Sequence, residues 1–370
     1  MQYLYFTYPF FLSFTSCGIL IFLNQFFGLG SDKVTGVQKF HLTSISRLGG
    51  VGISAALFFS SILPLNKDAS IQLLIQLLLV ALPVFFAGTL EDLTHKIAPS
   101  FRLILALLSS TLAYLLLDVK VIRTDVWIVD WLLQWPLLIY LFSILVISGF
   151  THAINIIDGF NGLASGQVLL MLCFLSYLNF ATNQYDLLLV SLTLLSVTMG
   201  FFVLNWPFGK IFLGDGGAYL LGFCVVCLGL ILVSRCSEIS PFAPIMLGLY
   251  PLVEVLFSMY RRFFVKGHSI TQPDAIHLHS LVFRRIIKVK LSSINNPQLL
   301  NSSVAYIFWF STSVMGGLTC VFYKYTSILL FLFFIYIFIY IRLFIQLIRF
   351  KSPRLFYFFL IDVPQKIRRP

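Results

Sequence analysis

Residues 132–182, "LLQWPLLIYLFSILVISGFTHAINIIDGFNGLASGQVLLMLCFLSYLNFAT", hold two long apolar runs with a short polar segment between them. About 20 consecutive apolar residues suffice for one helical crossing of a bilayer, and each run is close to that length. The polar segment, "NIIDGFNGLASG" at 155–166, has one acid, two asparagines and three glycines. The pattern predicts two transmembrane helices joined by a tight loop, and it raises the question of what Asp158 does there.

The composition of the whole chain fits a membrane protein. Of the 370 residues, 59% are hydrophobic and 11% are charged, and the mean hydropathy is +0.95. A soluble domain has about 25% charged residues, so this chain has too few of them to cover a water-facing surface. This low share of charged residues argues against a soluble fold, and we expect no nucleic-acid partner.

The chain shows no internal division. No Pro-, Ser- or Gly-rich linker interrupts it, which predicts a single transmembrane domain over residues 1–370. The first 27 residues are typical of a retained helix and not of a cleaved signal peptide. Cys224 and Cys227 form a CxxC in mid-helix, where we expect small buried hydrophobes in preference to metal or redox ligands.

The apolar segments predict an all-α polytopic integral membrane protein with about eleven transmembrane helices. An odd number places the two termini on opposite sides of the membrane. The predicted exterior loops hold five of the 25 Lys and Arg residues, so the positive-inside rule makes the N-terminus exterior and the C-terminus cytoplasmic. The predicted helices cover residues 4–27, 48–64, 71–90, 100–118, 132–150, 166–182, 185–204, 217–235, 241–262, 303–323 and 326–348.

Five predicted cytoplasmic loops hold the polar chemistry, and the exterior loops hold no comparable cluster. A channel or transporter more often buries polar groups at mid-bilayer. The best candidates for such groups are Gln72 and Gln76, which interhelical hydrogen bonding also explains. Chemistry gathered at one interface favours an enzyme acting on a lipid and a cytoplasmic co-substrate. The loops lie near residues 28–47, 91–99, 151–165, 205–216 and 261–302.

Four acids lie in these loops: Glu91, Asp92, Asp158 and Asp215. Carboxylate oxygens are ligands that suit Mg²⁺ or Mn²⁺, and Mg²⁺ commonly takes one or two carboxylates together with substrate phosphates. Each acid taken alone is also compatible with a solvated loop residue or a helix cap. Glu91 and Asp92 are adjacent, so the four acids form three acidic sites. Three such sites on one face of a chain with few acids favour a metal-assisted site.

Glycines and basic residues accompany the acids. Gly214 and Gly216 flank Asp215 at the start of a predicted helix, where free N–H groups and the helix dipole favour phosphate. His277 and His279 point the same way if their loop is extended, and they could hold a phosphate, a uridine-like group or a metal. Zinc is disfavoured because no third His or Cys has the right spacing. Positive charge that suits phosphate comes from Lys39, His41, Arg47, Lys96, Arg284 and Arg285.

Together these residues predict phosphoryl transfer between a lipid-linked reactant and a soluble nucleoside diphosphate derivative. That chemistry depends mainly on positioning and on neutralising charge. Five stretches in order then carry a resemblance: "QKFHLTSISRLGG" (38–50), "GTLEDLTHKIAPSFRL" (88–103), "NIIDGFNGLASG" (155–166), "IFLGDGGAYLLG" (211–222) and "DAIHLHSLVFRR" (274–285). With them the chain resembles the polyprenyl-phosphate N-acetylhexosamine-1-phosphate transferases.

The resemblance implies a reaction and a location. A UDP-N-acetylhexosamine and undecaprenyl phosphate would give undecaprenyl-diphosphate-sugar and UMP, with Mg²⁺ as cofactor and Mn²⁺ as the alternative. The enzyme would be a multi-pass protein of the bacterial inner membrane with its active site on the cytoplasmic face, in contact with membrane lipids and compatible with a homodimer. It would initiate a cell-surface polysaccharide such as O-antigen, capsule or exopolysaccharide.

The resemblance also implies residue roles. It makes Asp215 the metal ligand and gives catalytic roles to Asp92, Glu91 and Asp158. The lipid phosphate would be bound by Lys39, His41, Arg47 and Lys96. The nucleotide sugar would be bound by Asn155, Asn161, Gly214, Gly216, His277, His279 and Arg284.

Three positions depart from the family pattern. Glu91 replaces an Asp of an Asp-Asp pair, Asn161 stands where a second Asp is frequent, and Ser280 replaces a His. Because of Glu91 and Ser280, an inactive homologue acting as a scaffold stays open as an alternative function. A transporter or lipid flippase is the main alternative from another functional class.

Overall fold

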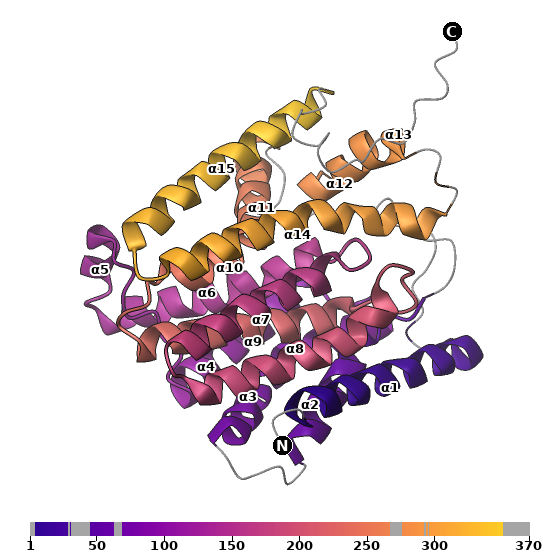
Figure 1. Cartoon of the computed structure of the whole chain (residues 1–370), viewed down its shortest axis with the longest axis horizontal. Helices are drawn as coiled ribbons and strands as arrows, with labels where there is room; N and C mark the ends of the chain where they lie inside the picture. The colour runs from indigo at the N-terminus through magenta and orange to yellow at the C-terminus, as the bar shows by residue number, and fades with distance from the viewer. Residues whose placement is uncertain are drawn as a thin grey trace.

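The computed structural model describes residues 4–28, 30, 45–62, 69–266, 276–291, 294 and 296–350. This part of the chain folds into helices and loops without a β-sheet (Figure 1). The long helices are α1 (Leu4–Phe27), α2 (Gly49–Ile62), α3 (Ala69–Thr94), α4 (Pro99–Leu116), α6 (Pro136–Ile157), α7 (Leu163–Ala181), α8 (Tyr185–Asn205), α9 (Gly214–Arg235), α11 (Leu249–Tyr260), α14 (Pro297–Phe322) and α15 (Thr326–Ile348). Shorter helices are α5 (Trp127–Leu132), α10 (Phe242–Leu247), α12 (Leu278–Val282) and α13 (Lys288–Lys290), with π-helical turns at Arg261–Lys266 and Phe283–Ile287.

The helical, multi-pass class predicted from the sequence is confirmed. Among the described residues, nine helices are long and apolar enough to cross a membrane. At 14 residues, α2 is shorter than a usual span. The predicted helix 241–262 is broken at Gly248, where a Cβ would lie 2.3 Å from the ring of Phe150. The count of eleven spans and the sides of the termini therefore stay predictions.

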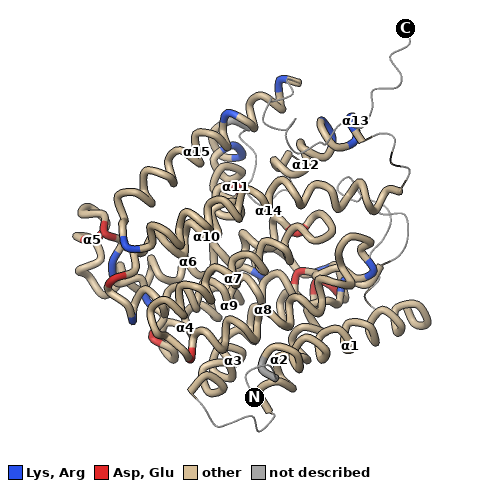
Figure 2. The backbone as a smooth tube through the Cα atoms, in the orientation of Figure 1, with Lys and Arg blue, Asp and Glu red and all other residues tan. Residues whose placement is uncertain are grey.

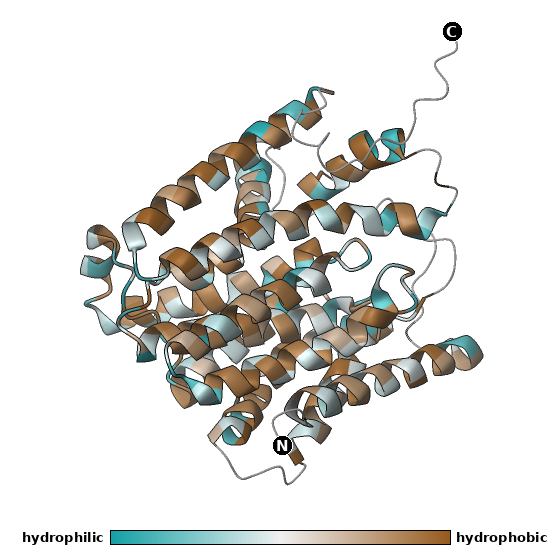
Figure 3. Cartoon of the chain, in the orientation of Figure 1, coloured by the Kyte–Doolittle hydropathy of each residue, from teal (hydrophilic) through white to brown (hydrophobic). Residues whose placement is uncertain are grey.

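Helix α9 lies at the centre of the bundle. It packs against α2, α3, α6 and α7, and 89% of its apolar window is buried. In α1 and α15 only 17% of the apolar window is buried, and both outer helices consist mostly of apolar residues (Figure 3). An exposed apolar surface of this extent fits contact with lipid tails.

Charged residues gather toward the two ends of the bundle, and most of its middle is uncharged (Figure 2). One end carries the loops after α3, α6, α8 and α11, and we call it the predicted cytoplasmic end. The other carries α5 and the α14–α15 turn, and we call it the predicted exterior end.

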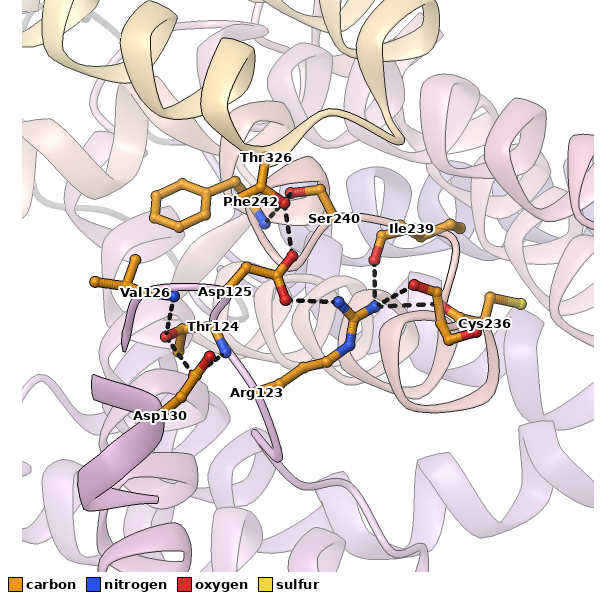
Figure 4. Close-up of polar contacts among 11 residues, drawn as sticks. Arg123, Thr124, Asp125, Val126, Asp130, Cys236, Ile239, Ser240, Phe242 and Thr326 are labelled. Atoms are coloured by element: carbon orange, nitrogen blue, oxygen red, sulfur yellow. Dashed lines mark hydrogen bonds and ion pairs between the residues drawn. The ribbon is translucent and has the colours of Figure 1, made fainter. Parts of the chain in front are cut away.

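The predicted exterior end holds a polar cluster that we did not expect from the sequence (Figure 4). The guanidinium of Arg123 donates to Asp125 at 2.8 Å and to the carbonyls of Ser237 at 3.0 Å and Ile239 at 2.5 Å. The hydroxyl of Thr326 donates to the second oxygen of Asp125 at 2.6 Å. The cluster joins three interhelical connections, and its groups satisfy one another, which indicates a structural role.

Glycines let α2 and α3 approach α9 at the predicted cytoplasmic end. A Cβ on Gly50 would lie 2.2 Å from the backbone nitrogen of Gly217, and one on Gly88 would lie 2.5 Å from that of Gly216. Both clashes are with backbone, which cannot move aside as a side chain can. The contact between these helices therefore requires glycine at 50 and 88.

We predict that Gly88→Ala destabilises the protein, because the added methyl forces α3 away from α9. Overpacking of this kind costs about 1–3 kcal/mol. Gly149→Ala is the matched control, since a Cβ there meets nothing within 4 Å and Ala is the better helix former. Thermal unfolding in detergent should show a lower Tm for Gly88→Ala only. Equal Tm values for the two variants would contradict the close approach.

Candidate active site

Backbone hydrogen bonds join the first and fourth predicted cytoplasmic loops. The Phe212 N–H donates to the Ser46 carbonyl at 2.9 Å, and the Gly49 N–H donates to the Phe212 carbonyl at 3.0 Å. A third bond runs from the Gly50 N–H to the Leu213 carbonyl at 2.9 Å. These bonds hold Arg47, the residue after Ser46, beside the start of α9.

Asp215 lies in the first turn of α9, next to two arginines. Its Oδ1 accepts from the guanidinium of Arg47 at 3.1 Å, and its Oδ2 pairs with that of Arg102. The preceding Gly214 has φ +73°, and a Cβ there would lie 2.1 Å from the Arg47 carbonyl oxygen. A glycine is therefore needed for the chain to enter α9 in this position.

Asp92, in the last turn of α3, is almost fully buried, with 2% of its surface exposed. Its two oxygens accept the N–H groups of Asp215 and Gly216, each at 2.9 Å. Arg47 lies 3.3 Å from Oδ1 through its Nε. Asp92 thus satisfies two of the backbone donors that every helix leaves free at its N-terminus, and it fixes the position of Asp215.

Asp158 follows the last residue of α6 and reaches the same cluster. It is partly buried, and it interacts with the charges of Arg47 and Asp215 and with the Gly214 N–H. Burial raises the pKa of Asp158 to about 7; Arg47 opposes this rise, Asp215 adds to it, and the Gly214 N–H opposes it. An acid with a pKa near neutrality is suited to exchange a proton at physiological pH.

Of the two predicted histidines, His279 lies against the Asp158 loop, and His277 stacks on His279. Their rings stack, with centroids 5.2 Å apart and planes at 9°. The ring of His279 lies 5.6 Å from that of Phe160 between centroids. Burial lowers the pKa of His279 to about 3, so this imidazole is neutral at physiological pH and offers hydrogen bonds but no charge.

Other predicted site residues lie apart from this cluster or serve the fold. Asn161 is buried: its side chain donates to the Pro207 carbonyl at 3.2 Å, and its N–H donates to the side chain of Asn301 at 2.8 Å. The Glu91 carboxylate accepts the Ile97 N–H at 2.8 Å. These bonds hold loops in place.

The remaining predicted site residues differ in how far they are buried. Asn155 is half-buried in the last turn of α6, and Gly216 packs against Thr89. Lys96 and Arg284 are exposed at the predicted cytoplasmic end. Lys39 and His41 lie outside the described residues.

Two residues of the region were missed from the sequence. Arg102, which pairs with Asp215, lies in the first turn of α4. It belongs to the second of the five stretches that carry the resemblance, but a single arginine at a helix start has no local pattern that marks its role. Glu254 bonds His277 from inside an apolar helix. A buried acid in an apolar segment is itself a signal of a functional site, and that signal was available.

The carboxylates can be compared with the needs of a divalent cation. The structure, over the residues that it describes, contains no group of three or more His, Cys, Asp or Glu side chains placed to hold a metal. Asp158 lies near enough to Asp215 for their charges to interact, which brings two carboxylates to one place. Such a pair fits Mg²⁺ when a phosphate-bearing ligand supplies further oxygens.

Comparison with known proteins agrees with the family resemblance seen in the sequence. Residues 74–233 match the family model described as glycosyl transferase family 4. A probable undecaprenyl-phosphate N-acetylglucosaminyl 1-phosphate transferase of Bacillus subtilis (strain 168) is 31% identical over 181 residues, 49% of this chain and 49% of that protein. The phospho-N-acetylmuramoyl-pentapeptide-transferase of Lactiplantibacillus plantarum is 30% identical over 149 residues, 39% of this chain and 44% of that protein.

A phospho-N-acetylmuramoyl-pentapeptide-transferase of Streptococcus uberis is 28% identical over 186 residues, 47% of this chain and 54% of that protein. The chain thus spans about half the length of the curated relatives that it matches. The matched region begins within α3, ends within α9 and includes Asp92, Asp158 and Asp215. The similarity of residues 74–233 to glycosyl transferase family 4 therefore includes all three carboxylates of the candidate site.

Proposed function

We propose that this chain transfers N-acetylhexosamine-1-phosphate from a UDP-sugar to undecaprenyl phosphate. An oxygen of the lipid phosphate would bond to the sugar-bearing phosphorus of the UDP-sugar. The bond from that phosphorus to the bridging oxygen would break, and UMP would leave. The products are undecaprenyl-diphosphate-sugar and UMP, and the step would initiate a bacterial cell-surface polysaccharide.

One observation carries this proposal: acids from the ends of three helices meet two arginines at one end of an apolar bundle. Asp92, Asp158 and Asp215 come from α3, the end of α6 and α9. Arg47 and Arg102 both contact Asp215. Phosphoryl transfer depends on such positioning and charge neutralisation, and the names of the relatives describe transfer of sugar phosphates.

Each group has a role in the proposed reaction. Asp215 and Asp158 would hold Mg²⁺, which when bound neutralises charge on the phosphate oxygens. The arginines Arg47 and Arg102 would bind phosphate through paired N–H donors. In the cation-free site, Asp158 would also accept the proton of a protonated lipid phosphate, as its raised pKa suits.

Further roles follow from position. Lys96, with Arg47, would attract the lipid phosphate at the membrane surface. Asn155, His277 and His279 flank the Asp158 loop and would bind the nucleotide sugar. Because both oxygens of Asp92 bind backbone N–H groups, we assign it the positioning of Asp215, in place of the catalytic role expected from the sequence.

The charge distribution supports an orientation. The site lies at the end with the basic loops, which the positive-inside rule places in the cytoplasm. UDP-sugars are cytoplasmic substrates, and the lipid phosphate would enter from the bilayer. We therefore propose an enzyme of the bacterial inner membrane with a cytoplasmic active site, formed by one transmembrane domain.

The first prediction from the proposed function concerns the transfer reaction itself. Purified protein, undecaprenyl phosphate and a panel of UDP-N-acetylhexosamines should give a lipid-linked sugar and UMP. EDTA should abolish the product, and Mg²⁺ or Mn²⁺ should restore it, because the acid pair needs a cation to engage phosphate. The measurement is transfer of radiolabelled sugar phosphate. Folded protein that gives no product with any donor would overturn the proposal.

A second prediction separates Asp215 from Asp92. Asp215→Asn should lower the transfer rate by at least about 100-fold, as removal of a charge-stabilising group does, with little change in Tm. Asp92→Asn should lower both the rate and the Tm, because an amide oxygen cannot accept two diverging N–H groups, and an unsatisfied donor costs about 1–3 kcal/mol. Rates and Tm values are measured on the same samples. An unchanged Tm for Asp92→Asn would refute its positioning role.

A third prediction concerns pH. Because burial raises the pKa of Asp158 to about 7, the carboxylate is protonated below that pH and ionised above it. Protons and Mg²⁺ then compete for this carboxylate. Transfer at a fixed, subsaturating Mg²⁺ concentration should therefore rise with pH through about 7, and the pH dependence should weaken as the Mg²⁺ concentration is raised. Substrate phosphates also titrate near pH 6. Asp158→Asn should therefore retain only the phosphate-dependent part of the profile, at a reduced rate; an unaltered profile in that variant would exclude the role.

A further inference from the structure

Glu254 is an acid inside the protein that the proposed chemistry does not use. It lies on α11 and is 1% exposed. A carboxylate removed from water costs several kcal/mol unless it is paired and hydrogen-bonded. Replacing such a group by a well-packed apolar residue is often neutral or stabilising. Folding alone therefore gives little reason for an acid at this position.

The partners of Glu254 belong to the histidine segment. Its Oε1 lies 3.0 Å from Nδ1 of His277, and both of its oxygens lie 3.2 Å from the Leu278 N–H. An ionised carboxylate only accepts hydrogen bonds, so Nδ1 of His277 carries a proton. The orientation of the ring is thereby fixed, and so is the start of α12. Tyr340 of α15 lies beside the same carboxylate.

A second residue of α11 holds the second histidine. The hydroxyl of Tyr250 lies 2.9 Å from Nδ1 of His279. Tyr250 and Glu254 are four residues apart, which places them on one face of the helix. The two imidazoles are two residues apart and stack on one another. One face of α11 thus holds Nδ1 of each ring.

The far side of His279 faces the Asp158 loop. A Cβ built on Gly159 would lie 3.7 Å from Nε2 of His279. Phe160, the next residue, packs against the same ring. With Nδ1 occupied on the α11 side, Nε2 is the ring nitrogen directed toward the loop that follows α6.

We infer that Glu254, with Tyr250, positions His277 and His279 against the Asp158 loop so that they bind the nucleotide sugar. This inference rests on the proposed function. Glu254 acts through the imidazoles and does not itself touch substrate. The geometry assigns it to the nucleotide-sugar side of the site, because the ring of His279 lies against Gly159 and Phe160, the two residues that follow Asp158.

The test is a comparison of kinetic constants. Glu254→Gln keeps the size of the side chain and removes its charge. It should raise the KM for the UDP-sugar by about 10- to 100-fold, the range found when a partner that orients a ligating imidazole is removed. The KM for undecaprenyl phosphate should stay within about twofold. Glu238→Gln, the same change at an exposed glutamate of the predicted exterior end, is the control and should alter neither.

A double-mutant cycle tests whether Glu254 acts through His277. If it does, Glu254→Gln should have no further effect in a His277→Asn background, because the two changes remove one interaction. Additive effects, or equal rises in both KM values, would overturn the inference. Tyr250→Phe, which removes a single hydroxyl, repeats the test at His279 should Glu254→Gln fail to fold.

A measurement that does not need activity separates this inference from the proposed function. In ¹⁵N-histidine-labelled protein, the His277 signals are identified by their loss in His277→Asn. Glu254→Gln should shift the Nδ1 signal of His277, because its carboxylate partner is lost. An unmoved signal would refute the positioning role even in an active enzyme. A shifted signal in protein without transferase activity would support the positioning and refute the proposed function.

Discussion

The N-terminus of α9 depends on contact with the backbones of α2 and α3, and the candidate site is built on that contact. Gly50 and Gly88 remove the side chains that would separate the helices. The close approach brings the Asp92 carboxylate onto the first N–H groups of α9. A buried carboxylate needs such donors, and a buried helix end needs an acceptor. Each satisfies the other, and Asp215 is placed between Arg47 and Arg102 as a result.

The membrane explains why polar chemistry gathers at the ends of the bundle. Inside a bilayer a backbone satisfies its own hydrogen bonds only as a helix, so irregular loops that can place acids lie where the helices end. The Asp158 loop and the segment before α9 are such connections. Glu254 is the exception within α11, and its carboxylate is covered by His277 and the Leu278 N–H.

Hydropathy alone predicted the helices well, since apolar runs of about 20 residues have few other stable conformations in a membrane. The helix ends were less accurate. The predicted end at 150 missed the last two turns of α6, because "THAIN" is polar enough to resemble a loop although its residues pack inside. The start of α9 was predicted three residues late, since Asp92, which satisfies its first N–H groups, is 123 positions away. Contacts such as Arg102 with Asp215 have no local pattern and required the fold.

The two ends of the bundle differ in how their charges are balanced. At the predicted exterior end, Arg123 pairs with Asp125 and with backbone carbonyls, so both of these charges have a partner within the protein. At the other end, within the described residues, three carboxylates lie beside two guanidinium groups, and burial, with a further contribution from the charge of Asp215, raises the pKa of Asp158. Repulsion between acids costs folding free energy, and sites that retain such repulsion commonly serve function. A cation with phosphate is the kind of ligand that would relieve it, which is why the acids at this end point to chemistry and the Arg123 cluster points to structure.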